Sequence, residues 1–124
     1  MKAEQDNIVL VKSFDFAVRV VTLYKHIRNT HDERVLSTQL LKSGTSIGAN
    51  IREALRSHTR KEFAAKMNIS LKEAYETEYW LELLYKTEYI AQDVYDSIFS
   101  ECRDLTNILA KIVLTVKEGN RSES

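Results

Sequence analysis

Apolar residues recur at steps of three and four in four separate stretches of this chain, which is the pattern of amphipathic helices. The last stretch is the clearest, because its positions alternate steps of four and three like a coiled-coil seam: Val94, Ile98, Cys102, Leu105, Leu109, Ile112 and Val116. The 124 residues include no proline and three glycines, which favours long helices over a turn-rich sheet. We therefore expect an all-α protein.

The four patterns predict an up-down-up-down four-helix bundle over residues 13–118. Residues 1–12 are expected to be a flexible lead and residues 119–124 a flexible tail, with Gly119 closing the last helix. Thr59 and Glu62 match a capping box, whereas Ser13 and Ser37 are simpler N-cap candidates. For the second helix, a start near Asp32 is the alternative to Ser37. The expected helices run from about Phe14 to Arg28, Ser37 to Arg56, Arg60 to Thr87 and Asp93 to Lys117.

The stretch from Gln39 to Leu55 carries conflicting local signals. Its serines, threonine and glycines are poor helix formers, yet its apolar residues keep helical spacing. Gly44 and Gly48 lie one turn apart and share a face, where another backbone can approach closely. One continuous helix, which the periodicity favours, and a break at Ser43–Ser46 both remain open.

Charge and cysteine content indicate which kind of protein and which cellular compartment to expect. Eighteen basic and eighteen acidic residues give a formal net charge of zero, so the chain lacks the basic excess of many nucleic-acid-binding proteins. Cys102 is the single cysteine, which suits a reducing cytosol, and residues 1–7 lack the apolar run of a signal peptide. No apolar run approaches the roughly 20 residues that cross a bilayer. We expect a cytoplasmic protein with no membrane partner.

The sequence contains no recognisable catalytic or metal-binding constellation. A di-iron bundle needs Glu-x-x-His pairs, but Leu23, Arg28 and Leu55 stand three residues before the histidines at 26, 31 and 58. The Gly44–Gly48 stretch lacks the Gly-Lys-Ser/Thr ending of a phosphate loop. We expect no enzyme activity, no cofactor, no metal and no small-molecule substrate.

Basic residues gather in one part of the chain. Arg52, Arg56 and Arg60 recur every four residues, and Lys61 and Lys66 follow closely. Phosphate binding needs such a stripe, so these five residues form the candidate nucleic-acid-binding site. The alternative is an ordinary solvated helix end, which the neutral net charge favours.

Two further groups of residues are candidates for contacts between helices or copies. Gly44, Gly48, Tyr79 and Trp80 are candidates for close packing and assembly, because exposed aromatic residues often mark protein interfaces. The second group forms either a solvated face or a buried polar network that sets the helix register: Asn50, Glu53, Lys72, Glu73 and Glu76.

Four motifs together resemble the four-helix-bundle proteins encoded in intervening sequences of bacterial 23S ribosomal RNA genes. They are SFDFA at residues 13–17, QLLKSGTSIGANIREA at 39–54, FAAKM at 63–67 and KEAYETEYWLELL at 72–84. The resemblance covers nearly the whole chain and implies a bundle that assembles as a ring, typically a homopentamer, with no catalytic residues. A related accessory protein of retroelements binds nucleic acid and a reverse transcriptase, but that relative is strongly basic.

Two functions follow as hypotheses. The first is a non-enzymatic, homo-oligomeric helical scaffold that binds RNA or a nucleic-acid-processing protein partner. The second is a protein–protein adaptor with no nucleic-acid contact, which the neutral charge and the aromatic residues favour.

Overall fold

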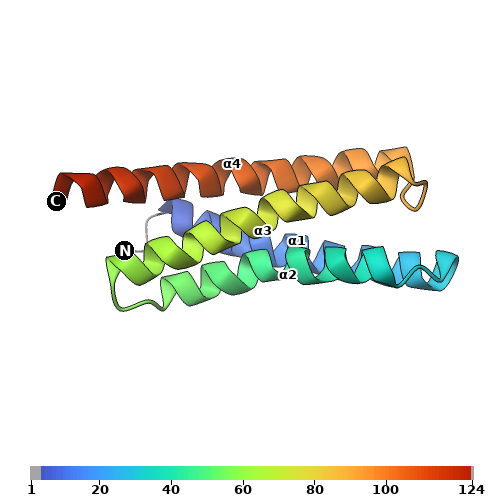
Figure 1. The fold of residues 1–124 in the computed structure, drawn as a ribbon, viewed down its shortest axis with the longest axis horizontal. Coiled ribbons are helices and arrows are strands. Elements are labelled where there is room, and N and C mark those ends of the chain that lie inside the picture. Colours follow the sequence, from blue (N-terminus) through green and yellow to red (C-terminus); the bar gives the residue numbers. More distant parts are fainter. Residues whose placement is uncertain (1–3, 124) are drawn as a thin grey trace.

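Four α-helices account for most of the protein in the computed structural model, which describes residues 4–123 and the side chains of residues 6–119. The helices are α1 (Glu4–His31), α2 (Val35–Leu55), α3 (Arg60–Lys86) and α4 (Gln92–Glu123), and they lie side by side along their lengths (Figure 1). The described residues contain no β-strand. The all-α class predicted from the sequence is therefore confirmed.

The helices stand at the four corners of one bundle. α1 packs against α2 and α4, α3 packs against the same two helices, and the described residues show no packing contact between α1 and α3. The core runs along the length of the bundle and takes residues from every helix: Val9, Phe16, Val20, Ile27, Leu40, Ile47, Ile51, Phe63, Met67, Ala74, Leu81, Leu84, Ile98, Cys102, Leu105 and Leu109. α1 and α3 are therefore diagonal to each other.

The first and last helices extend further than the sequence predicted. α1 begins at Glu4 rather than Phe14, so residues 4–12 of the expected lead are helical, and Val9 is fully buried in the core. Ser13 does not cap α1 but lies buried inside it, where its hydroxyl donates to the Leu10 carbonyl (3.0 Å). α4 continues through Gly119 to Glu123, so this glycine does not end the helix. Residues 1–3 and 124 of the expected ends lie outside the described residues.

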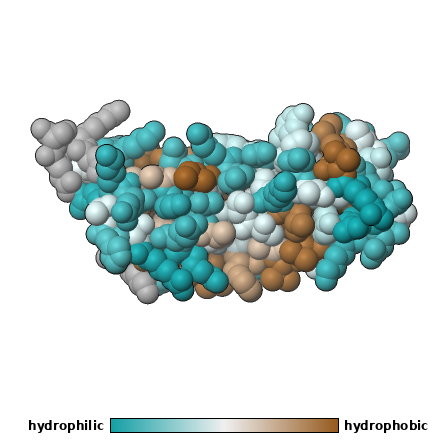
Figure 2. All heavy atoms as spheres, turned by 60° about the horizontal axis from the view of Figure 1, so that its bottom comes forward, coloured by the Kyte–Doolittle hydropathy of each residue, from teal (hydrophilic) through white to brown (hydrophobic). Residues whose placement is uncertain are grey.

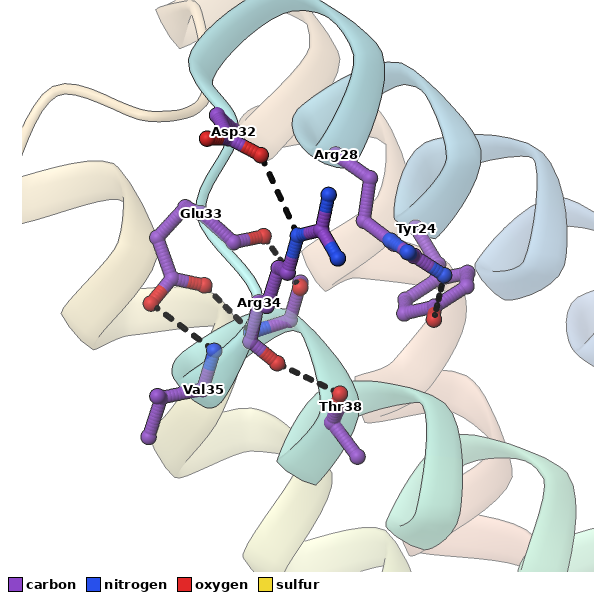
Figure 3. Close-up of polar contacts among 8 residues, drawn as sticks. Tyr24, Arg28, Asp32, Glu33, Arg34, Val35 and Thr38 are labelled. Carbon is purple, nitrogen blue, oxygen red and sulfur yellow. Dashed lines mark hydrogen bonds and ion pairs between the residues drawn. The ribbon is translucent and has the colours of Figure 1, made fainter.

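α2 begins at Val35, between the two predicted starts at Ser37 and near Asp32, because Glu33 satisfies its first backbone N–H groups. The Glu33 carboxylate accepts from the backbone N–H of Val35 (3.2 Å), Leu36 (2.9 Å) and Ser37 (2.8 Å). Figure 3 shows Glu33 beside Val35 in this turn. Partial burial alone would raise the pKa of this carboxyl, but these hydrogen bonds favour the charged form and lower the pKa below its usual value. Ser37 is instead a buried residue of the first turn.

The predicted start of α3 is confirmed. The Thr59 hydroxyl accepts from the backbone N–H of Glu62 (3.1 Å), as a capping box requires. The Glu62 carboxylate reaches back to the backbone N–H of His58 (3.3 Å), one residue before the cap.

α2 is one continuous helix through Ser43–Ser46, as its periodicity predicted. The hydroxyls of this stretch turn back onto carbonyls one turn earlier: Thr45 donates to Leu41 (2.7 Å) and Ser46 to Lys42 (2.6 Å). These bonds satisfy the polar side chains without breaking the helix.

Candidate functional site: the outer face of α1

α1 carries a second apolar stripe that points away from the core. Val11, Phe14 and Val18 follow each other at steps of three and four, and their side chains are 60%, 54% and 53% exposed. We call these three residues the α1 ridge. Hydrophobic residues, coloured brown, also reach the surface at the lower middle and right of Figure 2, in which the side carrying α2 is turned forward. The helical spacing of Val11, Phe14 and Val18 is visible in the sequence. It was overlooked because the same stretch also contains the buried stripe through Phe16 and Val20.

A groove follows the ridge on the side of α2. It has a volume of about 350 Å³, and its α1 wall includes Leu10, Phe14 and Ala17. The missing side chain of Gly48 lets α2 come close to α1, because a Cβ there would lie 3.3 Å from the Ser13 hydroxyl oxygen. The Arg52 guanidinium lies 5.7 Å from the centre of the Phe14 ring, within cation–π range. The lining of this groove is mainly apolar, and its charged members are Arg52, Glu53 and Arg56.

A second groove, of about 410 Å³, begins at Val18 and continues between α1 and α4 towards the end of α1. Val18 and Leu23 of α1 and Val94 and Ile98 of α4 give it an apolar lining. Nearby, Arg19 of α1 and Glu101 of α4 form an ion pair at 2.6 Å. At the height of Val11 and Phe14, by contrast, the depression between α1 and α4 is lined mainly by charged side chains, Lys12, Asp15, Glu101 and Asp104. The ridge therefore has one apolar groove along its α2 side and a second that begins at Val18.

The five predicted cationic residues do not form one stripe. Arg52 and Arg56 line the groove beside α1, whereas Lys66 of α3 forms an ion pair with Glu53 at 3.4 Å. Arg60 and Lys61 are exposed at the start of α3, and Arg60 lies near the end of α4, where a Cβ at Gly119 would be 3.9 Å from its guanidinium. The exposed cations Arg56 and Lys61 are thus at the α2–α3 turn.

The two glycines predicted to allow close packing do so between helices of the same chain. Gly44 is buried, and a Cβ there would lie 2.8 Å from both methyl groups of Val20 in α1. This face of α2 is therefore covered by α1 and is not free for a second copy at Gly44. Tyr79 is 59% exposed, and its ring meets the half-buried Trp80 ring edge-on at 5.0 Å.

The predicted polar residues do not join into one buried network. The Asn50 amide donates to the Ser46 carbonyl of its own helix (2.8 Å), and Lys72 and Glu76 are exposed. Glu73 is half-buried; burial raises its pKa, and the neighbouring Glu76 raises it further by charge and by a hydrogen bond. The solvated-face interpretation fits most of these positions.

Small hydroxyl residues make the buried polar contacts between α2 and α3. The Thr77 hydroxyl donates to the Ser43 hydroxyl (3.0 Å), and the Ser70 hydroxyl donates to the Ile47 carbonyl (2.8 Å). On the other side of α3, Glu78 accepts from Thr106 (2.6 Å) and Arg103 (3.0 Å) of α4. These residues were missed because a serine or threonine on a core face is not distinguishable in sequence from one at the surface.

Cys102 is buried, and burial raises the pKa of its thiol well above the usual value. A thiol in this setting is a small core residue rather than a nucleophile. Over the described part of the chain, no three His, Cys, Asp or Glu side chains are placed to hold a metal ion. Within that same part, no helix combines the length and apolarity needed to cross a membrane.

The chain is similar to one protein family over most of its length. The model of the 23S rRNA-intervening sequence protein family matches residues 5–111. The chain is also similar to the crystal structure of a protein of unknown function from the S23 ribosomal protein family of Bacteroides thetaiotaomicron VPI-5482. The two are 53% identical with a TM-score of 0.86, over 88% of this chain and 97% of that chain. None of the curated proteins compared with the chain matches it.

Proposed function

The chain belongs to the family of 23S rRNA-intervening sequence proteins, and from this premise we propose that it is a non-enzymatic scaffold that assembles as a ring of identical copies. Each copy is an up-down-up-down four-helix bundle, and five is the number of copies that the family resemblance implies. The ring works in the cytoplasm, where the lone Cys102 stays reduced. It acts on RNA or on a ribonucleoprotein partner.

The observation that carries the assembly is the α1 ridge. Three apolar side chains in a line, each more than half exposed, form an apolar surface that continues into an apolar groove beside Phe14 and another beside Val18. Surfaces of this kind on water-soluble proteins usually mark interaction sites. The spacing of four and three is the spacing at which one helix packs against another. A helical surface of another copy is the simplest partner for it.

We expect Val18→Glu to break the assembly, because it places a charge within the apolar contact. The mass in solution should fall from that of the oligomer to that of one chain, 14.4 kDa, as measured by light scattering. Val35→Glu is the matched control, because Val35 is also an exposed valine but begins α2 at one end of the bundle. A wild-type protein that is monomeric at micromolar concentration would contradict the proposal.

RNA binding is supported by the cations at the α2–α3 turn and by the link that the family name makes to 23S rRNA. A neutral chain offers only a weak positive patch, but several copies in one ring multiply weak contacts. Arg56 and Lys61 are the residues proposed for this contact, because Arg52 is engaged with Phe14 and Lys66 with Glu53.

Reversing two of these charges should abolish retention of a labelled structured RNA at low salt, while the mass of the assembly stays unchanged. The test variant is Arg56→Glu with Lys61→Glu, and the control is Lys111→Glu with Lys117→Glu, which changes the net charge equally on the exposed surface of α4. For wild-type protein, retention should fall steadily as salt rises. Equal retention by both variants would rule out the assigned residues.

The second candidate function is a protein–protein adaptor. The exposed Tyr75 and Tyr79 and the zero net charge favour it, since tyrosine is enriched at protein interfaces. Wild-type oligomers that retain no RNA even at low salt would select this function over the first.

A further inference from the structure

Exposed apolar and aromatic side chains also lie on the opposite side of the bundle from the α1 ridge. α3 is diagonal to α1, and its outer face exposes Ile69, Tyr75 and Tyr79 by 40%, 50% and 59%, with the exposed charges of Lys72 and Glu76 between them. We call these three residues the α3 face. Its apolar part is mainly aromatic, whereas the α1 ridge is mainly aliphatic.

The two surfaces also lie at the same height along the bundle. Gly48 and Gly44 of α2 stand beside Ser13 and Val20 of α1. The same part of α2 stands beside α3, because Ile47 contacts Ser70 and Ser43 contacts Thr77. Residues 13–20 of α1 are thus level with residues 70–77 of α3, and both helices run in the same direction.

The charges beside the two surfaces are opposite in sign. On the side of α2, Arg52 reaches over Phe14 of the α1 ridge. Glu73 is half-buried on the side of α3 that faces α2, and Glu76 lies within hydrogen-bonding reach of it; burial raises the pKa of Glu73, and the charge and hydrogen bond of Glu76 raise it further. A cation brought to this pair would relieve the repulsion, and Arg52 is a cation at nearly the same height.

We propose that the α1 ridge of one copy packs against the α3 face of the next copy, with Arg52 beside Glu73. This inference rests on the proposed assembly and adds which surfaces meet. Because the two surfaces are different and lie on opposite sides of the protomer, the contact is heterologous, and each copy keeps one free surface for the next. Equal height lets such contacts close into a ring without a step along the axis.

Two variants that each lose one surface test the pairing. The ridge variant carries Val11→Glu and Val18→Glu, and the face variant carries Tyr75→Glu and Tyr79→Glu. Both variants should fold, because all four substituted side chains are exposed. Helical content by circular dichroism checks this. Each variant alone should be a monomer of 14.4 kDa, and an equimolar mixture should form a 1:1 dimer of twice that mass, because one intact ridge and one intact face remain.

The other outcomes are decisive as well. A face variant that assembles like the wild type, or a mixture that stays monomeric, would overturn the pairing while leaving self-assembly itself standing. A contact of α1 with α1 would give the first of these results. A monomeric wild-type protein would instead remove the proposed function on which the pairing depends.

Charge exchange gives an independent measurement on the same interface. Arg52→Glu alone and Glu73→Arg alone should each raise the concentration at half-assembly by about tenfold, because each places like charges opposite one another. The double variant should restore assembly close to the wild-type concentration. Additive losses in the double variant would show that these two side chains do not meet.

Discussion

Gly44→Leu is expected to lower the free energy of unfolding by about 3 kcal/mol or more, the upper part of the range for overpacked cores. A Cβ at Gly44 would lie 2.8 Å from both methyl groups of Val20, which is closer than side chains approach one another. Val20 is fully buried and β-branched, so it has little freedom to turn away. The added side chain would have to push α1 away from α2 where the two helices are in close contact.

Urea denaturation followed by circular dichroism measures this effect. Gly119→Ala is the matched control, because Gly119 is also a helical glycine but a Cβ there would only reach 3.9 Å from the Arg60 guanidinium. That substitution should leave stability unchanged or raise it by up to about 1 kcal/mol through helix propensity. Equal midpoints for Gly44→Leu and the wild type would contradict the close approach of α1 and α2.

Phe16→Ala and Phe14→Ala should affect different properties, although the two residues are of one type and lie two positions apart. Phe16 is fully buried, so its truncation should cost about 3–5 kcal/mol of unfolding free energy. Phe14 is 54% exposed and contacts Arg52, so its truncation should cost the protomer only about 0.5–1 kcal/mol. Phe14→Ala should instead weaken the assembly, because this ring is at the centre of the α1 ridge.

Denaturation at several protein concentrations separates the two effects, because dissociation makes the contribution of assembly depend on concentration. Light scattering gives the mass of each variant under native conditions. If Phe14→Ala destabilised the protomer as much as Phe16→Ala, or left the mass unchanged at every concentration, the role of the α1 ridge would be wrong.

Several features were predictable because they depend on neighbours in the sequence. The spacing of apolar residues predicted all four helices, and the Thr59–Glu62 pair marked the start of α3. The two glycines one turn apart predicted a close approach, and the structure places it between α1 and α2. The family suggested by the four motifs is also the one whose model matches the chain.

Other features were not predictable from the sequence, because they depend on which parts of the folded protein a side chain contacts. Glu33 caps α2 from a turn, where its carboxylate reaches three backbone N–H groups that no local sequence rule assigns to it. The predicted polar residues at Asn50, Lys72 and Glu76 make local or solvent contacts, while Ser43, Ser70 and Thr77 form the buried ones. Burial decides between these roles, and burial is a property of the packed bundle.

The sequence by itself determined the helical class, the number of helices and the approximate extent of α2 and α3, because backbone hydrogen bonds within a helix and side-chain periodicity are local. The tertiary structure decided which of the two apolar stripes of α1 lies in the core. The stripe through Phe16 meets α2 and α4 there, and the α1 ridge is left outside. Either stripe satisfies the helical pattern, so only the packing of all four helices against one another selects between them.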